Sequence, residues 1–333
     1  MLASEMLASE MSMVDAIRTA LARAMTDDER VIVLGEDVGT DGGVFRATDG
    51  LLAAFGRDRV IDLPISESSF VGFGVGLAAQ GMRPVIEYQF SGFLFPAIDQ
   101  LVNHASRLRN RTRGRLSCPM VVRAPFGAGV HAPEHHSESA EAMYAHIPGL
   151  RVVIPSSPAK AYGLLLAAIR NPDPVVFLEP KRIYRSSRET VIDDGTELAL
   201  DTCFRLRSGD DVSIITWGAC TTEALSAAER LAVQGIQADV IDVATLRPLD
   251  MATILASVER TGRCVIVHEA VRSGGFGAEI AAQLADVGLT SLLAPVRRVT
   301  GYDTVVPLAR LEYEFLPSED RIVAAVNEVM SYT

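Results

Sequence analysis

The sequence is poor in residues that could form disulfides or thiolate metal sites. Its four cysteines lie far apart in 333 residues and form no CxxC pair: Cys118, Cys203, Cys220 and Cys264. Scattered cysteines in strand-like apolar runs indicate reduced, buried thiols. No apolar run reaches the ~18 residues that a membrane-spanning helix needs. These absences predict a cytoplasmic protein without a membrane segment.

Basic residues are also in short supply. The chain has 31 Lys and Arg against 42 Asp and Glu, a formal net charge of −11, which argues against a nucleic-acid-binding surface. Hydrophobic residues make up 48% and charged residues 22%, the balance of a folded globular protein. A chain of 333 residues is too long for one simple core, so we expect two domains.

The first eleven residues, MLASEMLASEM, repeat a five-residue unit and lack the basic start and apolar centre of a signal peptide. We expect residues 1–12 to form a disordered extension. From Met13 onward apolar residues recur at helical spacing, and Ser12 with Asp15 has the pattern of a capping box. The folded part is therefore expected to begin with a capped helix.

Short apolar runs alternate with helical patterns through the first half of the chain. The strand-like runs are 31–35, 83–90, 120–125, 151–156 and 174–180, and the helical segments are 68–80, 96–111, 138–146 and 158–170. Continuous apolar runs are typical of strands covered on both faces. Their alternation with helices predicts a mostly parallel sheet in an α/β domain.

A polar, charged segment at 181–197 interrupts this alternation, and a second alternation follows it. Strands are expected at 211–218, 238–246, 263–270 and 295–301, and helices at 219–234, 250–261, 275–287 and 319–331. The sequence thus predicts two doubly wound α/β domains. We place the first domain at 13–190, a linker at 191–210 and the second domain at 211–333.

Two glycine-rich stretches need to be distinguished from nucleotide-binding loops. GFGVG (72–76) lies inside an expected helix and lacks the GxGxxG fingerprint, which favours close helix packing over phosphate binding. SGGFGAEIAAQL (273–284) opens a helix whose N-terminal amides could bind an anion. No acidic residue follows it at the spacing of an NAD site, so dinucleotide binding is disfavoured.

The loop FGAGVHAPEHHSES (126–139) holds three of the six histidines, His131, His135 and His136. Loops at the carboxyl ends of parallel strands are where α/β folds bind their ligands. A zinc site is disfavoured, because His135 and His136 are adjacent and no CxxC or HExxH accompanies them. Proton transfer near neutral pH is the stronger interpretation, and a surface loop without a role is the alternative.

Glu67 lies in PISESSFVGFGVG (64–76), between an expected strand and an expected helix, and this stretch has no Lys or Arg. A structural interpretation places it in the first helical turn behind a Ser66 cap, where the dipole contributes about 0.3–1 kcal/mol. A functional interpretation has an apolar pocket raise its pKa, so that it shares a proton with a ligand nitrogen. The local pattern does not choose between them.

The chain from Met13 onward resembles a single known family. The first half contributes VIVLGEDVG (31–39), PISES (64–68), EYQFSGFLFPAIDQLVNHASRLR (87–109), VVRAPFGAGVHAPEHHSES (121–139) and DPVVFLEPKRIYR (173–185). The second half contributes TWG (216–218), VIDVATLRPLD (240–250) and, from residue 267, VHEA followed by GGFGAEIA. Together and in order, these motifs resemble the β subunit of the decarboxylase component of 2-oxo acid dehydrogenase complexes.

That resemblance implies a thiamine-diphosphate enzyme of two α and two β subunits, with active sites between subunits. In the family, the α subunit carries a GDG motif and paired asparagines that hold magnesium and the diphosphate, and this sequence has neither GDG nor NN. The implied fold is a pyrimidine-binding domain followed by a transketolase C-terminal-like domain. An isolated β chain is then expected to be inactive.

The resemblance also implies roles for single residues. Glu67 matches the glutamate that hydrogen-bonds a ring nitrogen of the cofactor's aminopyrimidine. His136 matches the histidine that assists acyl transfer to the lipoyl group of the acyltransferase core component. Ile65, Gln89 and Phe93 fall where the family lines the aminopyrimidine pocket, and the family often has tyrosine in place of Phe93.

A structural potassium ion is a further implication of the resemblance. The matching ligand positions are Met120, Val121, Ala168, Ile169, Asn171 and Asp173. Oxygen ligands suit such a hard cation. The commonest relatives have an acid at position 171 and an asparagine at 173, so an ordinary helix-end turn is the alternative.

The expected reaction is decarboxylation of a 2-oxo acid and reductive acylation of lipoamide. FPAIDQLVNHASRLR and APEHHSES slightly favour a branched-chain 2-oxo acid over pyruvate, and acetoin cleavage uses the same scaffold. Transketolase and deoxyxylulose-phosphate synthase are disfavoured, because those single chains carry the GDG domain that is missing here. A non-catalytic scaffold or nucleotide-binding module of the same fold is the alternative from another functional class.

Overall fold

The computed structural model describes residues 8–332, which form two compact units. The first unit comprises the chain up to Phe126 together with Tyr144–Leu200, and the second comprises Gly127–Met143 together with Asp201–Thr333. Among residues 8–332, no helix is long and apolar enough to cross a membrane.

Six parallel strands of the first unit lie side by side in the order β6, β7, β5, β4, β2, β3. Their bounds are β2 Val31–Gly35, β3 Val60–Asp62, β4 Arg83–Glu87, β5 Val121–Phe126, β6 Arg151–Val153 and β7 Val175–Pro180. Every residue of β2, β5 and β7 is buried, as continuous apolar runs predict. The parallel order brings the carboxyl ends of β4, β2 and β3 to one edge of the sheet.

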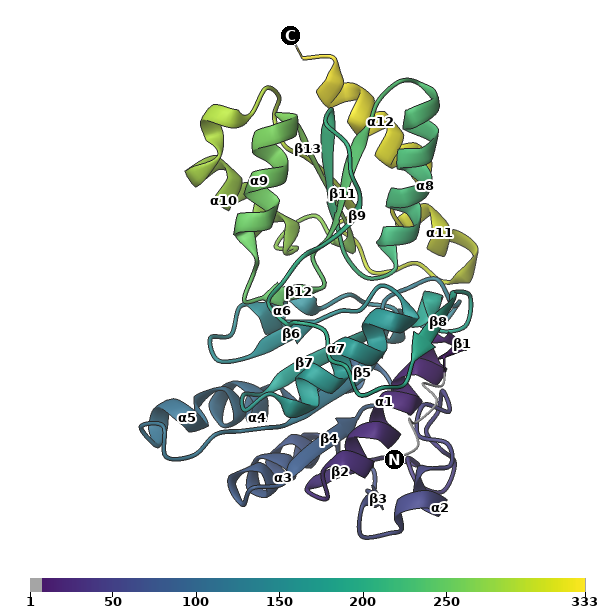
Figure 1. Cartoon of the computed structure of the whole chain (residues 1–333), viewed down its shortest axis with the longest axis vertical. Coiled ribbons are helices and arrows are strands. Elements are labelled where there is room, and N and C mark those ends of the chain that lie inside the picture. Colours follow the sequence, from purple (N-terminus) through teal and green to yellow (C-terminus); the bar gives the residue numbers. More distant parts are fainter. Residues whose placement is uncertain (1–7, 333) are drawn as a thin grey trace, which may run out of the picture. The chain divides into compact units, whose positions relative to one another are not determined.

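Helices α1 (Met13–Asp27) and α7 (Pro158–Arg170) pack against each other in the first unit (Figure 1). The predicted capping box of α1 is confirmed, since Ser12 and Asp15 exchange side-chain and backbone hydrogen bonds. Ser157 and Pro158 likewise start α7, with the Ser157 hydroxyl accepting from the Lys160 amide. The shorter α2 (Leu51–Phe55) precedes β3.

Helix α3 (Glu67–Ala79) packs on β4 and α4. A Cβ added at Gly74 would lie 2.5 Å from Ile86 Cδ1, and one at Gly72 would lie 3.1 Å from Gln100 Oε1. The glycines of GFGVG therefore allow close packing, as predicted, although a Cβ at Gly76 would meet open space.

One predicted helix, 96–111, is wrong as a continuous element. The chain there forms four short pieces: η1 (Ser91–Ala97), α4 (Ile98–Asn103), η2 (Ala105–Arg107) and α5 (Leu108–Arg111). Pro96 lies within η1 and supplies no amide hydrogen bond to a regular α-helix. The helix expected at 138–146 is shorter than predicted and spans α6 (Glu141–Ala145).

The expected disordered extension at 1–12 is wrong for its last five residues. Ala8–Ser12 form β1, which pairs antiparallel with β8 (Arg188–Ile192), and residues 1–7 lie outside the described range. Both strands are polar and mostly exposed, so they carry no apolar pattern from which to predict them. Lys181–Ile183, just before β8, form η4.

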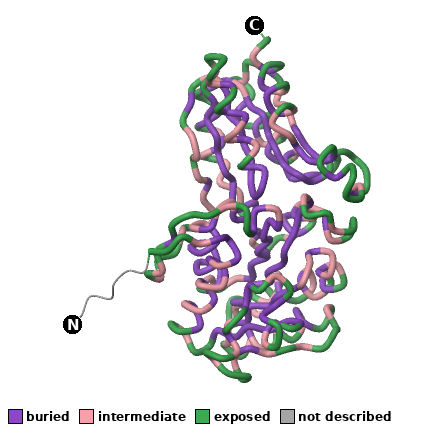
Figure 2. Tube along the Cα trace, turned by 90° about the vertical axis from the view of Figure 1, so that its right-hand side faces the viewer, coloured by how far each residue is buried: buried purple, intermediate pink, exposed green. Residues whose placement is uncertain are grey.

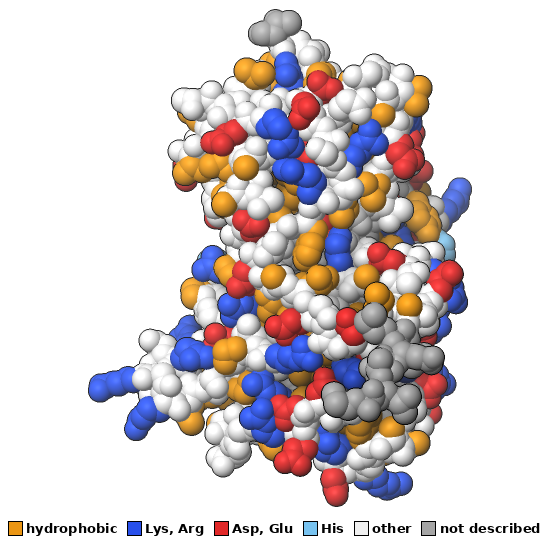
Figure 3. All heavy atoms as spheres, viewed as in Figure 1, with side chains coloured by type: hydrophobic (Ala, Val, Ile, Leu, Met, Phe, Trp, Pro, Cys, Tyr) orange, Lys and Arg blue, Asp and Glu red, His pale blue; other side chains and the backbone are white. Residues whose placement is uncertain are grey.

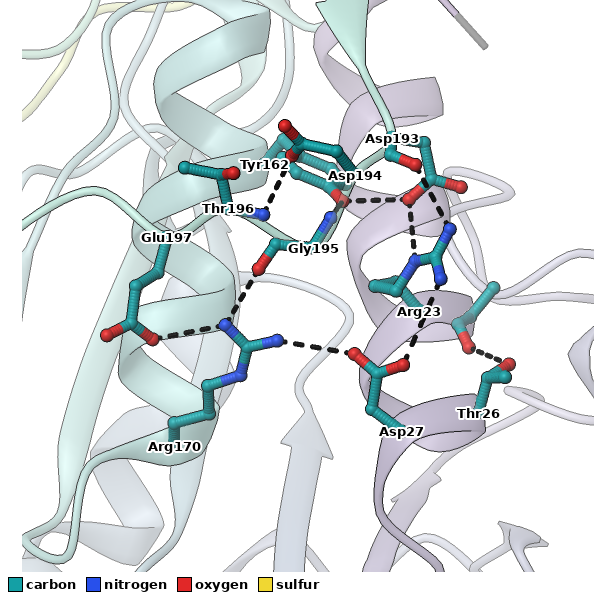
Figure 4. Close-up of polar contacts among 11 residues, drawn as sticks. Arg23, Thr26, Asp27, Tyr162, Arg170, Asp193, Asp194, Gly195, Thr196 and Glu197 are labelled. Carbon is teal, nitrogen blue, oxygen red and sulfur yellow. Dashed lines mark hydrogen bonds and ion pairs between the residues drawn. The ribbon is translucent and has the colours of Figure 1, made fainter. Parts of the chain in front are cut away.

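The segment after β8, which begins the linker predicted at 191–210, is bound to α1 and α7 (Figure 4). Asp193 accepts hydrogen bonds from Arg23 Nε at 2.9 Å and from the Tyr162 hydroxyl at 2.7 Å. Arg170 donates to the Gly195 carbonyl at 2.9 Å. Residues 193–197 thus belong to the first unit, while the domain limits at 190 and 211 stay predictions.

The second unit contains a five-stranded sheet in the order β14, β13, β10, β11, β9. Its strands are β9 Phe204–Arg207, β10 Val212–Thr216, β11 Ala238–Asp242, β13 Cys264–Val271 and β14 Arg297–Gly301, and the short β12 is Thr245–Arg247. All pairs are parallel except β9 with β11. The edge strand β9 lies within the predicted linker and was missed, although its alternation of apolar residues with arginines is the pattern of a half-buried strand.

Helices cover both faces of this sheet (Figure 1). Helices α8 (Cys220–Val233) and α12 (Glu319–Met330) share a core with β10, β11 and β13, and α9 (Met251–Thr261) and α10 (Gly277–Val287) pack on the other face. The short η5 (Leu289–Ser291), η6 (Ala309–Leu311) and α11 (Glu312–Phe315) join them. Two α/β units confirm the predicted fold class.

Burial follows this layering, because the central strands of the two large sheets are buried and many exposed segments lie at helix ends and loops (Figure 2). On the face seen in Figure 3, basic and acidic side chains are interspersed, and basic side chains project near the α5 end. That end carries Arg107, Arg109, Arg111, Arg113 and Arg115, all exposed. The visible face therefore presents no continuous basic surface.

Candidate active site

Glu67 is the first residue of α3, which follows β3 at the carboxyl edge of the first unit's sheet. Ser66 occupies the N-cap position, but its side chain accepts no hydrogen bond from the helix. Instead, the Ser66 carbonyl accepts from the Ser69 amide at 2.9 Å and from the Ser69 hydroxyl at 2.7 Å. The structural interpretation in which the Ser66 side chain caps the helix is therefore wrong.

The backbone at Glu67 is held by Tyr88, whose buried hydroxyl donates to the Glu67 carbonyl oxygen at 2.6 Å. The Glu67 carboxylate is half-buried, and no basic side chain among residues 8–332 pairs with it. The backbone is thus fixed while the carboxylate stays available. This arrangement suits a carboxylate that interacts with a ligand.

A second carboxylate, Glu36, lies beside this one and was missed by the sequence analysis. It directly follows β2, which pairs with β3 and β4, and its Oε1 atom is buried without a hydrogen-bond partner. Burial raises the pKa of Glu36, and the charge of Glu67 raises it further. The available signal was its position at the carboxyl end of an apolar strand, in VIVLGE.

The three other predicted pocket residues lie at the same sheet edge. Ile65 precedes Glu67 and is 84% exposed, a high value for an isoleucine. Gln89 follows β4 and is half-buried, and Phe93 in η1 packs edge-on against Phe90 at 6.2 Å between ring centroids. Residues after β2, β3 and β4 therefore meet at one edge, with the carboxylates of Glu36 and Glu67 among apolar and aromatic groups.

A buried ionic network lies in the neighbouring strands of the same sheet. Arg123 on β5 donates two hydrogen bonds of 2.7 Å to Glu179 on β7, and it also pairs with Glu87 on β4. Tyr184 donates its hydroxyl proton to Glu179. Burial raises the pKa of Glu87, an effect that Arg123 partly offsets. The network ties β4, β5 and β7 together with one guanidinium between two carboxylates.

The histidine loop, which we define as residues 127–143, packs within the second unit. His136 ends the short turn η3 (Glu134–His136), is half-buried, and lies 3.9 Å from His135 between ring centroids. The buried Ser137 hydroxyl donates to the Pro133 carbonyl at 3.1 Å and so closes this turn. Residues 8–332 contain no cluster of three or more metal-binding side chains, so the zinc interpretation gains no support.

Arginine side chains contact two of the six positions implied for potassium, Ile169 and Asp173. Arg83 Nη1 donates to the Ile169 carbonyl at 2.9 Å, and Arg109 Nε donates to Asp173 Oδ1 at 2.6 Å. Arg151 Nη1 lies 3.6 Å from the other Asp173 oxygen. A cation placed there would be repelled by three guanidinium groups. Potassium binding stays a prediction.

The GGFG stretch is explained by packing around a histidine. A Cβ at Gly275 or Gly277 would lie 2.7 Å from ring atoms of His268, which is fully buried on β13. Trp217 stacks on the same ring at 5.1 Å. Burial lowers the pKa of His268 to about 3, so the ring is neutral at physiological pH. The glycines before α10 therefore make room for a ring, which favours packing over the anion-binding alternative.

Comparisons with known families agree with this two-part architecture. Residues 9–187 match the family described as the transketolase pyrimidine binding domain, and residues 202–322 match the transketolase C-terminal domain.

Full-length relatives are similar as well. The chain is 45% identical over 324 residues to the pyruvate dehydrogenase E1 component subunit beta of Bacillus subtilis, which spans 97% of this chain and 100% of the relative. The protein of the same name from Acholeplasma laidlawii is 45% identical over 318 residues, covering 96% and 97% of the two chains.

Two solved structures share the fold. A split-gene transketolase, described as an inactive beta4 tetramer, superposes with a TM-score of 0.80 at 22% identity, over 97% of this chain and 99% of the other. A transketolase mutant from Pichia stipitis gives 0.69 at 12% identity, over 97% of this chain and 46% of the other.

Proposed function

The chain belongs to the family of β subunits of the decarboxylating first component of 2-oxo acid dehydrogenase complexes, and from this premise we propose that it provides one side of a thiamine-diphosphate site. The observation that carries the proposal is the pair of carboxylates, Glu67 and Glu36, without a basic partner at the sheet edge. When bound there, thiamine diphosphate supplies the nucleophilic carbon and the electron sink for decarboxylation.

In this proposal, Glu67 holds or releases a proton at a ring nitrogen of the cofactor's aminopyrimidine. No basic side chain among residues 8–332 pairs with the Glu67 carboxylate and competes with the ring nitrogen for it. Tyr88 keeps the backbone of Glu67 in place during this exchange. Ile65, Gln89 and Phe93 lie at the same edge, and water is excluded from the proton path once a partner covers the exposed Ile65.

We propose that an α subunit completes the site and holds the magnesium and the diphosphate. The chain has no GDG motif with paired asparagines to bind them, and the 84% exposure of Ile65 next to Glu67 leaves an apolar surface for a partner to cover. The family's assembly of two α with two β subunits fits this need. The acyltransferase core component is the further partner.

His136 is proposed to act in the second half-reaction, the transfer of the acyl group to a lipoyl group. An imidazole on a half-buried turn can donate or accept a proton near neutral pH while still being reached by a large acceptor. A substitution of His136 should therefore impair acyl transfer, whereas a substitution of Glu67 should impair decarboxylation.

The names of the two relatives described above favour pyruvate as the 2-oxo acid. The branched-chain preference inferred from the sequence motifs stays a prediction, and acetoin cleavage is the alternative on the same scaffold. Assays with pyruvate, 3-methyl-2-oxobutanoate and acetoin on one preparation distinguish the three. The two 2-oxo acids release carbon dioxide and give acyl products of different size, whereas acetoin cleavage releases acetaldehyde and no carbon dioxide.

The experiment is co-expression with the α subunit, followed by decarboxylation assays. We expect Glu67→Gln to lower the decarboxylation rate by roughly 100-fold or more, the size of a lost general acid–base contribution. Glu29→Gln, at an exposed position of the same unit, is the matched control. Wild-type activity in Glu67→Gln would refute the mechanism, and a tight complex with no turnover on any substrate would support the scaffold alternative.

A further inference from the structure

The histidine loop lies within the sequence range of the pyrimidine-binding family, residues 9–187, yet it packs as part of the second unit. Chain order alone would assign it to the first unit, because it directly follows β5. Contacts with the second unit must therefore determine its conformation. Two carboxylates outside the loop, Glu312 and Glu269, provide most of the polar contacts, and a third, Glu141, belongs to the loop itself.

Glu312, at the start of α11, makes the densest set of these contacts. Its Oε1 accepts from the Gly129 amide at 2.7 Å, and its Oε2 accepts from the His131 amide at 2.9 Å. The same Oε2 lies 2.9 Å from His131 Nδ1. The next residue, Tyr313, donates its hydroxyl proton to the Gly129 carbonyl at 3.2 Å. One turn of helix thus binds two loop residues, Gly129 and His131, by backbone and side chain.

Glu269, near the end of β13, holds the adjacent part of the loop. Its Oε2 accepts from the Ala128 amide at 3.3 Å and lies 3.5 Å from the Ser139 hydroxyl. A Cβ at Gly127, whose φ is +84°, would lie 2.5 Å from this oxygen. Gly127 is therefore required both by its left-handed backbone and by the close approach of Glu269.

The far end of the loop is held by Glu141, whose Oε1 accepts from Trp217 Nε1 at 3.3 Å. Ala128 at the near end also packs into a small apolar cluster with Val306, Phe315 and Leu316. Both ends of the segment that carries His136 are thus fixed to the second unit.

Buried carboxylates are costly unless hydrogen-bond donors surround them. Glu312 is 1% exposed, and the donors that satisfy it are the loop amides. Any loop conformation that withdraws these amides leaves a buried charge unpaired, and this coupling restricts the loop to one conformation. Exposed anchors would not have this effect, because water would replace the lost donors.

We propose that Glu312, supported by Glu269, is a positioning residue that fixes the histidine loop and thereby the place of His136. The proposal rests on the proposed function of His136 in acyl transfer. Glu312 itself contacts the loop rather than the reacting groups, so its effect on the reaction is indirect.

The test uses the assembled α and β subunits carrying Glu312→Gln, which keeps the shape of the side chain but removes its charge and one acceptor. Glu314→Gln, on an exposed side of the same helix, is the matched control. We measure lipoyl acylation, decarboxylation with an artificial electron acceptor, and hydrogen exchange at the amides of Gly129 and His131.

We expect Glu312→Gln to accelerate exchange at both amides and to lower lipoyl acylation by roughly tenfold or more, as misplaced reacting groups do. Decarboxylation with the artificial acceptor should stay within about twofold, because the loop is not used in that step. Equal losses in both reactions, or unchanged exchange, would overturn the proposal. The Glu314→Gln control should match the wild type in every measurement.

If the Glu312→Gln protein does not fold, Tyr313→Phe replaces it in the same test. It removes one loop contact without unpairing a charge, and we expect a smaller change in the same direction for exchange and acylation. His136→Ala separates this proposal from the proposed function. If His136→Ala acylates normally while Glu312→Gln still accelerates exchange, the role of His136 is wrong and the anchoring by Glu312 stands.

Discussion

In the first unit, the carboxylates of Glu67 and Glu36 lie close enough to affect each other and have no basic partner among residues 8–332. In the second unit, the buried carboxylate of Glu312 accepts from two backbone amides and lies beside an imidazole. Both units thus place acidic groups near their proposed functional residues. Only the second unit supplies hydrogen-bond donors for these carboxylates.

The difference separates two uses of a carboxylate. A carboxylate saturated with amide donors has a fixed orientation and makes a stable anchor for a loop. One without donors is electrostatically unfavourable in the empty protein and is stabilised when a ligand brings a proton or a donor. The number of donors around a buried acid therefore predicts whether it holds the backbone or acts on a ligand.

The strongest test of this distinction is Arg123, which serves two buried carboxylates, Glu87 and Glu179. Replacing it by leucine leaves both acids buried without their cation. We expect Arg123→Leu to lower the free energy of unfolding by about 3–5 kcal/mol, the usual cost of breaking a buried pair. Urea denaturation at pH 7 measures this, with Arg57→Leu at an exposed position as the control.

A loss below about 1 kcal/mol in Arg123→Leu would mean that these acids take up protons cheaply in the folded state. Glu87 and Glu179 would then behave like Glu36 and Glu67. The distinction between carboxylates with and without partners would fail. Lowering the pH should reduce the loss, since protonated carboxyl groups no longer need a cation.

Much of the fold could be predicted because its strands are continuous apolar runs, as in β2 and β7, and its helices begin at clear signals such as Ser157 and Pro158. Strands β1 and β8 could not, because they form a polar, exposed ribbon whose pairing depends on residues about 180 positions apart. Local patterns carry no information about such pairing.

The residues of the candidate site also differ in how far the sequence could predict them. Roles for Glu67 and His136 came only from the resemblance of the whole chain to a known family, because the local pattern around each residue left alternatives open. Glu312 was missed, because its partners Gly129 and His131 lie more than 180 residues away and an acid before an aromatic residue is an unremarkable surface pattern. Glu36 could have been found from its place at a strand end, but no local signal indicated its proximity to Glu67.

The substitution Glu36→Gln tests the pair of carboxylates without a basic partner, Glu36 and Glu67. Folding raises the pKa of Glu36, so the folded state binds more protons than the unfolded state, and stability is lost as pH rises through the shifted pKa. Removing the charge should therefore raise the melting temperature at pH 8 by roughly 1–3 °C and have little effect at pH 4. Differential scanning calorimetry at both pH values measures the change.

The same substitution should lower decarboxylation by the assembled enzyme, because it removes a carboxylate that lies close to Glu67 in the proposed site. A more stable but less active protein is the expected combination. Glu29→Gln should change neither quantity. If Glu36→Gln is instead destabilising at pH 8, Glu36 has donors in solution and belongs with the anchoring acids.

The smallest expected effect concerns Glu141, an anchor with only one donor. Burial, with a contribution from Glu269, raises the pKa of Glu141 to about 7, and the partner of its Oε1 is Trp217, the single tryptophan of the chain. The neighbouring His268 stays neutral in this range. Tryptophan fluorescence should therefore change with a midpoint near pH 7 as the carboxyl group ionises.

The free energy of unfolding should fall as pH rises from about 4.5 to 7 and then level off, because the folded state holds the Glu141 proton to higher pH than the unfolded state does. Glu141→Gln should abolish the fluorescence transition, whereas Glu134→Gln, at an exposed position of the same loop, should retain it. A transition that persists in Glu141→Gln would assign the titration to another group. Loss of the transition in Glu141→Gln would place Glu141 between the acids that anchor a loop and those that act on a ligand. Its one hydrogen-bond donor, Trp217, orients the carboxyl group without keeping it ionised.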